Sequence, residues 1–205
     1  MKIDTHHHLW DMATRPQSWM TDEMKTQIEG PYDMRDWEAV AKPEAIDYSI
    51  AVQTVPVADE TPELLATGVE SKSLAGVVGW LDVTDSRFRE NLDALRQLPG
   101  GNKLVGLREL AEYHPDSDWM SSPTMHEVAR ALGEWNLTLD LLVLTHQIPA
   151  ATKLVKANPD VRFVLDHLAK PSLEPADLGQ WSENLRDLAS FENVACKFSG
   201  YAVFD

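Results

Sequence analysis

The chain has 205 residues, 43% of them hydrophobic, with 33 acidic and 18 basic residues and a formal net charge of −15. This length and apolar content are enough for one sizeable core. The acidic balance excludes nucleic acid and anionic membrane surfaces as partners, since both require clustered Lys and Arg. The single cysteine excludes an intramolecular disulfide, and no apolar run reaches the roughly 20 residues of a membrane helix. We therefore expect a cytoplasmic protein with one domain over residues 1–205.

The first predicted strand, residues 2–5, leads directly into three consecutive histidines. Side chains alternate between the two faces of a strand, so His6 and His8 are expected on one face and His7 on the other. Two imidazoles at this spacing can bind one divalent metal ion. The pair therefore predicts a metal or substrate site at the start of the chain.

Further short, continuous apolar runs follow, as is typical of parallel strands covered on both faces. They span residues 46–55, 74–83, 103–108, 137–145, 161–168 and 194–199. Helical spacing of apolar residues appears around 88–95, 125–135 and 181–188. A further helix is expected to contain Leu154 and Val155 and to end at Asn158-Pro159, whereas residues 11–35 predict a long loop. Repeated strand–helix units favour a (β/α)₈ barrel or an open doubly wound sheet, and no glycine-rich nucleotide-binding loop is present.

In a barrel, chemistry gathers at the carboxyl ends of the strands. His6, His8, Gln53, Arg108, His146, His167 and Lys197 all lie at or near such ends in the predicted order. Arg108 is always charged and needs an anionic partner, either a substrate carboxylate or a buried acid. His146 is a candidate ligand but also precedes Pro149 at the start of a helix. Trp10 is a candidate for the wall of a pocket.

Five segments together resemble the lactonase branch of the amidohydrolase superfamily, which includes fuconolactonase-like and pyrone dicarboxylate lactonase-like enzymes. They are residues 3–11, 106–108, 115–119, 163–171 and 196–200. The resemblance implies a (β/α)₈ barrel of the TIM type and a hydrolase that opens a sugar lactone or a carboxylated lactone to a hydroxy acid.

The resemblance also implies roles for individual residues. His6, His8 and His167 would bind a divalent metal ion such as zinc, or the lactone carbonyl, although some relatives need no metal. Arg108 would bind the substrate, as would Trp10, Gln53, His146 and Lys197, and His167 and Arg108 would be catalytic.

The branch carries a water-activating aspartate on strand eight, in a Gly-Ser-Asp-Trp type of motif, and no such motif occurs in the 205 residues. We therefore expect a barrel truncated after strand seven, with strand edges that favour a homo-oligomer. Two alternatives stay open. One is a catalytically inactive barrel that binds a ligand or a partner subunit, and the other is a metal-dependent decarboxylase of the same superfamily.

Overall fold

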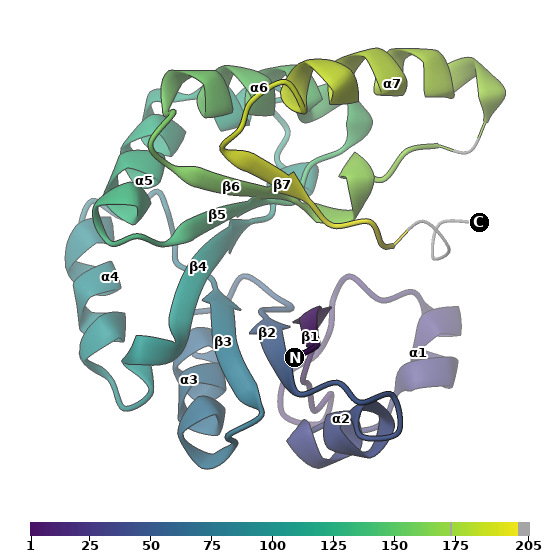
Figure 1. Cartoon of the computed structure of the whole chain (residues 1–205), viewed down its shortest axis with the longest axis vertical. Helices are drawn as coiled ribbons and strands as arrows, with labels where there is room; N and C mark the ends of the chain where they lie inside the picture. The colour runs from purple at the N-terminus through teal and green to yellow at the C-terminus, as the bar shows by residue number, and fades with distance from the viewer. Residues whose placement is uncertain (173, 201–205) are drawn as a thin grey trace. The chain divides into compact units, whose positions relative to one another are not determined.

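The computed structural model describes residues 1–172 and 174–200, which form seven parallel strands alternating with helices (Figure 1). Two compact units are present: residues 1–82 with 86–105, and residues 83–85 with the chain from 106 onward. The predicted alternation of parallel strands and helices is confirmed. No helix in the described part of the chain is long and apolar enough to cross a membrane.

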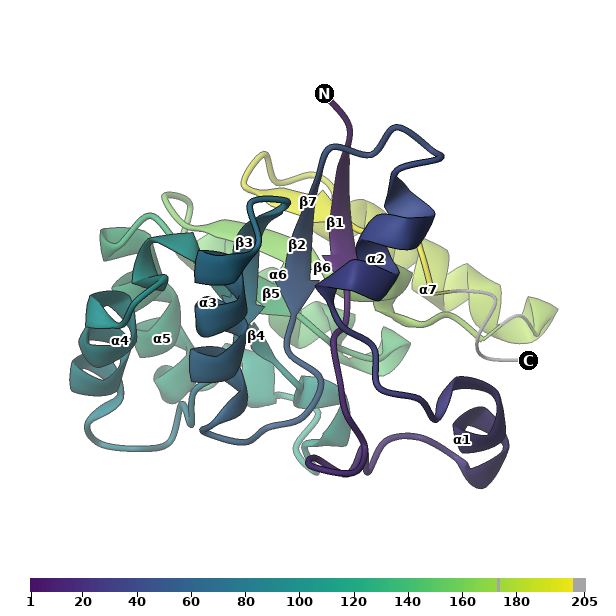
Figure 2. The same ribbon diagram turned by 90° about the horizontal axis from the view of Figure 1, so that it is seen from below.

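The first unit holds three parallel strands in chain order, β1 (Ile3–His7), β2 (Tyr48–Val52) and β3 (Leu74–Gly79). Helices α2 (Met34–Ala41) and α3 (Glu60–Glu70) lie alongside them (Figure 2), and α1 (Asp22–Ile28) and α4 (Phe88–Gln97) complete the unit. A short 3₁₀ turn, η1 (Gly101–Lys103), leads into β4 (Leu104–Glu109). β4 begins in the first unit and continues in the second.

The second unit continues the parallel order from β4 through β5 (Thr138–Leu141), β6 (Arg162–Leu165) and β7 (Val194–Cys196). Helices α5 (Pro123–Glu134), α6 (Ile148–Ala157) and α7 (Pro175–Leu188) lie alongside these strands (Figure 1). Short 3₁₀ turns follow or precede several elements: η2 (Ala111–Tyr113), η3 (Trp119–Ser121), η4 (Thr145–Gln147) and η5 (Asp166–Ala169). Leu139 and Leu141 of β5, Phe163 and Leu165 of β6, and Ile148 of α6 are fully buried and form the core.

The predicted long loop over residues 11–35 is wrong in part, because it contains α1 and the start of α2. α1 buries none of its residues, so it shows no apolar periodicity, and its start is stabilised by the Thr21 side chain, which accepts a hydrogen bond from the Met24 amide. α2 begins with a capping box between Asp33 and Asp36. Helix α3 was not predicted either.

The strands are mostly shorter than the apolar runs that predicted them. β2, for example, ends at Val52 rather than at residue 55, and β6 ends at Leu165 rather than at residue 168. Gln53 directly follows the end of β2, and Asp166 and His167 directly follow the end of β6, so these polar side chains lie just past the strands.

Candidate active site

His6 and His8 lie at the end of β1, with their Nε2 atoms 3.2 Å apart. The Nδ1 atom of His8 is 2.7 Å from the backbone carbonyl oxygen of Val52 at the end of β2. A carbonyl oxygen only accepts, so Nδ1 carries the hydrogen and Nε2 presents a lone pair. Two nitrogens that each lie about 2.0–2.1 Å from a tetrahedral zinc are roughly 3.3 Å apart. The donor set and its spacing therefore fit a divalent metal ion.

His7 is separated from this pair by packing against α2. Its ring lies 5.6 Å from that of Trp37, and the Trp37 indole donates a 2.8 Å hydrogen bond to Asp4. Burial lowers the pKa of His7, against the opposing effect of Asp4. The register of β1 against β2 shifts between Asp4 and His7, so the strand pairing is irregular at the segment where side chains were predicted to alternate between the two faces. His7 thus packs on Trp37 of α2 and lies apart from the His6–His8 pair.

Trp10 and Gln53, two further predicted site residues, also belong to the first unit. Trp10 forms part of the wall of a cavity of about 330 Å³ between the loop after β1, the segment before α2 and helix α3. Asp11, Arg15 and Tyr32 contribute to the same wall. Gln53 directly follows β2 and is fully buried, with its backbone amide bonded to the carbonyl oxygen of Val78.

A buried cluster of four charges links the ends of β4, β5, β6 and β7 in the second unit. Nη1 of Arg108 lies 3.2 Å from Oδ2 of Asp166, and both side chains are at most 4% exposed. The Lys197 ammonium bridges two carboxylates, at 2.5 Å from Asp140 and 2.6 Å from Asp166. Two cations and two anions make the cluster neutral, which is how buried charges are tolerated.

The two carboxyl groups of the cluster differ in pKa. Burial raises the pKa of Asp140 to about 6, although Lys197 opposes the shift. Burial acts in the same direction on Asp166, but there the two cations Lys197 and Arg108 outweigh it and hold the pKa below its usual value. Asp166 is thus the firmly ionised member, because it faces both cations.

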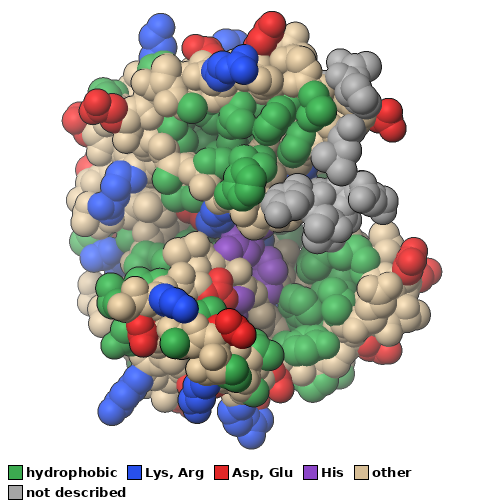
Figure 3. All heavy atoms as spheres, turned by 45° about the vertical axis from the view of Figure 1, so that its right-hand side comes forward, with side chains coloured by type: hydrophobic (Ala, Val, Ile, Leu, Met, Phe, Trp, Pro, Cys, Tyr) green, Lys and Arg blue, Asp and Glu red, His purple; other side chains and the backbone are tan. Residues whose placement is uncertain are grey.

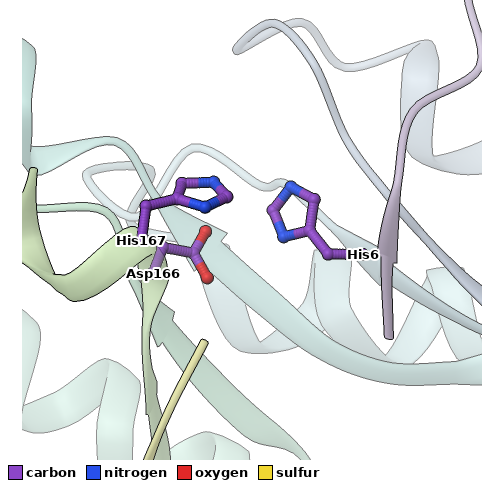
Figure 4. Close-up of side chains that lie close together, drawn as sticks. All are labelled: His6, Asp166 and His167. Carbon is purple, nitrogen blue, oxygen red and sulfur yellow. The ribbon is translucent and has the colours of Figure 1, made fainter. Parts of the chain in front are cut away.

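His167 follows Asp166 directly, and both side chains project from the end of β6 (Figure 4). The backbone at His167, Leu168, Ala169 and Lys170 is left-handed, with φ between 49° and 60°. Left-handed backbone costs roughly 1–2 kcal/mol per non-glycine residue, and such strain gathers at functional sites. The Trp181 indole stabilises this turn by donating a 2.8 Å hydrogen bond to the carbonyl oxygen of Leu168.

The imidazole of His167 is partly exposed, and its Nδ1 lies 3.0 Å from Oγ of Ser199. Burial lowers its pKa, and the cations Arg108 and Lys197 lower it further against the opposing effect of Asp166. Histidine side chains are visible at the surface in Figure 3. His6, His8 and His167 are each partly exposed. These rings are therefore within reach of solutes.

Of the residues predicted in the second unit, the structure brings Arg108 and Lys197 together through Asp166 and places His167 next to Asp166. His146 lies exposed in η4 and, among the described residues, forms no hydrogen bond with this group. Sequence reasoning missed Asp140. A lone carboxylate within the apolar run 137–145 was the signal that could have found it, since a buried charge needs a partner.

Residues 3–205 match the model of the Amidohydrolase family. The chain belongs to this family. An L-fucono-1,5-lactonase of Burkholderia ambifaria is 29% identical over 199 residues, which cover 97% of this chain and 67% of the relative. A crystal structure of an amidohydrolase from Burkholderia multivorans with bound zinc superposes with a TM-score of 0.88 at 27% identity, over 98% of this chain and 70% of that chain.

More distant amidohydrolase structures share the fold. A probable 2-pyrone-4,6-dicarboxylic acid hydrolase from Acinetobacter baumannii, at 13% identity, superposes with a TM-score of 0.74 over 99% of this chain and 72% of that chain. The predicted fold class, an α/β fold of the TIM-barrel type with seven strands in the chain, is confirmed. The resemblance to the lactonase branch is confirmed by the family match and by the L-fucono-1,5-lactonase relatives.

Proposed function

We propose that this amidohydrolase hydrolyses the ester bond of a lactone to give a hydroxy acid. The observation that carries the proposal is the His6–His8 pair, in which the hydrogen bond from His8 to Val52 presents the Nε2 lone pair at the end of β1. The L-fucono-1,5-lactonases among the relatives support a lactone as substrate.

His6 and His8 would hold a divalent metal ion, and zinc is favoured because a related structure contains it. His167 is proposed as a further ligand or as the group that polarises the lactone carbonyl. When bound, the metal supplies a Lewis acid for the carbonyl oxygen. The protein's own contribution is to fix the tautomer of His8 through Val52, as outer hydrogen bonds do in metal sites.

The buried charge cluster favours an uncharged lactone over a carboxylated one. Arg108 and Lys197 were the predicted cationic contacts for substrate, and both charges are balanced by Asp166 and Asp140. A substrate carboxylate would have to displace one of these buried ion pairs. Trp10, Gln53 and His146 remain proposed substrate-binding residues, and Gln53, which is fully buried, would do so only if the substrate opens its surroundings.

The test is to incubate the folded protein, with and without zinc, with matched panels of neutral sugar lactones and carboxylated lactones at neutral pH, and to follow acid release. Faster acid release from the neutral panel, lost on His6→Ala and on His8→Ala, is the expected result. Lactone binding without turnover would favour the ligand-binding alternative. Release of carbon dioxide from carboxylated compounds would favour the decarboxylase.

We further propose that residues 1–205 form a single domain, that the protein is cytoplasmic and acts in carbohydrate metabolism, and that it associates into a homo-oligomer. Size-exclusion chromatography with light scattering tests the last of these directly, since a monomer would contradict it.

A further inference from the structure

The segment that follows β7 contacts the Asp166–His167 pair with alternate residues. Lys197 is anchored by its amide, which donates a 2.9 Å hydrogen bond to the carbonyl oxygen of Leu165, and its ammonium reaches Asp166. Two residues later, Ser199 reaches His167. Phe198, between them, is 79% exposed. This alternation is that of an extended chain with one face directed at the end of β6.

Gly200, the next residue, also lies against His167, and it does so without a side chain. Its φ is +77°, in the left-handed region that favours glycine. A Cβ at this position would lie 2.8 Å from both Cβ and Cγ of His167, closer than real Cβ atoms approach other atoms. The absent side chain thus allows the backbone to approach the base of the imidazole.

We infer that Ser199 and Gly200 are positioning residues that hold the His167 imidazole in one orientation and one tautomer. A serine hydroxyl can both donate and accept, so the 3.0 Å contact by itself fits either tautomer. The inferred tautomer has the hydrogen on Nδ1, which donates to Ser199 Oγ and leaves the lone pair on Nε2, the nitrogen that would meet metal or substrate. Gly200 lets the backbone lie close to the ring on its Cβ side, where an added Cβ would meet Cβ, Cγ and Nδ1 of His167. The effect of these residues on catalysis rests on the proposed lactone hydrolysis, whereas their effect on the orientation and tautomer of His167 does not.

The direct test is long-range ¹H–¹⁵N NMR of the imidazole rings in metal-free protein at pH 8, with His167 assigned by His167→Gln. The wild type should show the Nδ1–H tautomer for this ring. Ser199→Ala should shift it toward the Nε2–H tautomer, and Ser199→Thr, which keeps the hydroxyl, should restore it. Ser190→Ala is the matched control, because it removes a serine hydrogen bond to the carbonyl oxygen of Asp187 outside the site. An Nε2–H tautomer in the wild type, or a pattern unchanged by Ser199→Ala, overturns the inference.

Kinetics give the second readout. Ser199→Ala should lower kcat by about 10- to 100-fold with little change in KM, as outer-shell changes do, and Ser199→Thr should recover most of it. Gly200→Ala should lower kcat at least as much, whereas Gly179→Ala should not, because an added Cβ there meets no atom within 4 Å. An unchanged kcat in Ser199→Ala overturns the positioning role. Absence of turnover in the wild type counts against the proposed function alone, since the NMR result still decides the tautomer.

Discussion

Nδ1 of His8 lies 2.7 Å from the backbone carbonyl oxygen of Val52, so the end of one strand sets the tautomer of a histidine on its neighbour. A backbone acceptor cannot be removed by a side-chain change at Val52. The tautomer of His8, the proposed metal ligand, therefore depends on the pairing of β1 with β2 and not on a second side chain.

This arrangement predicts that zinc binding depends on His6 and His8 and not on His7. His6→Ala or His8→Ala should each weaken zinc binding by more than about 100-fold, since loss of an outer-shell partner alone costs 10- to 100-fold. Isothermal titration with zinc measures the effect. His7→Ala is the control: it removes the packing on Trp37 and should lower the unfolding temperature while leaving zinc affinity within a few fold. Equal loss of affinity in all three variants would contradict the assignment.

The buried charge cluster predicts that removing one charge destabilises the protein more than removing a cation and an anion together. Lys197→Met leaves two buried carboxylates with only Arg108 and should cost roughly 3–5 kcal/mol of unfolding free energy. Adding Asp140→Asn restores neutrality and should recover a substantial part of that loss. Urea denaturation measures both.

Arg130→Ala, which breaks the exposed pair with Glu127, is the control for the cluster and should change the urea midpoint little. If the double variant is no more stable than Lys197→Met alone, the charges do not act as one neutral group.

The raised pKa of Asp140 predicts a pH dependence of stability. Burial raises its folded-state pKa from 3.8 to about 6, so the folded state binds the proton more tightly than the unfolded state. This contribution to stability is fully present below pH 4 and is lost as pH rises through 6. The free energy of unfolding of the wild type relative to Asp140→Asn should therefore fall between pH 4 and 7, by on the order of 1–3 kcal/mol. A difference that is flat over this range, measured by urea denaturation in matched buffers, would contradict the raised pKa.

The left-handed turn after β6 predicts a role for Trp181 at a distance from the site. Trp181→Phe removes the hydrogen bond to the carbonyl oxygen of Leu168 and should cost about 1–3 kcal/mol. It should also disturb the imidazole NMR signals of His167, because the turn carries that residue. Trp19→Phe loses an indole hydrogen bond to Gln17 in the first unit and should leave those signals unchanged. Unaltered His167 signals in Trp181→Phe would mean that the turn holds without this bond.

The features of the site that could be predicted from the sequence are those that depend on one strand at a time. Apolar runs predicted which segments form strands, although most runs extend past the strand ends. The spacing of His6 and His8 predicted that their rings meet, because alternation along one strand is a local property. The sequence alone did not show whether Arg108 pairs with a substrate anion or with a buried acid. Asp166 lies 58 residues away along the chain, and its pairing with Arg108 depends on strand register. α1 escaped prediction because a helix that buries nothing has no apolar stripe to detect. The left-handed run at 167–170 contains no glycine, so no local signal announced it.

Added salt should affect the exposed charges of the protein and the buried charge cluster differently. Added salt screens the repulsion among exposed groups of a chain that carries a net charge of −15, over a distance of about 8 Å at physiological concentration. Ion pairs removed from solvent, such as Arg108 with Asp166 and Lys197 with Asp140, are screened far less. Salt can therefore stabilise the molecule as a whole while the electrostatic environment around His167 stays nearly constant.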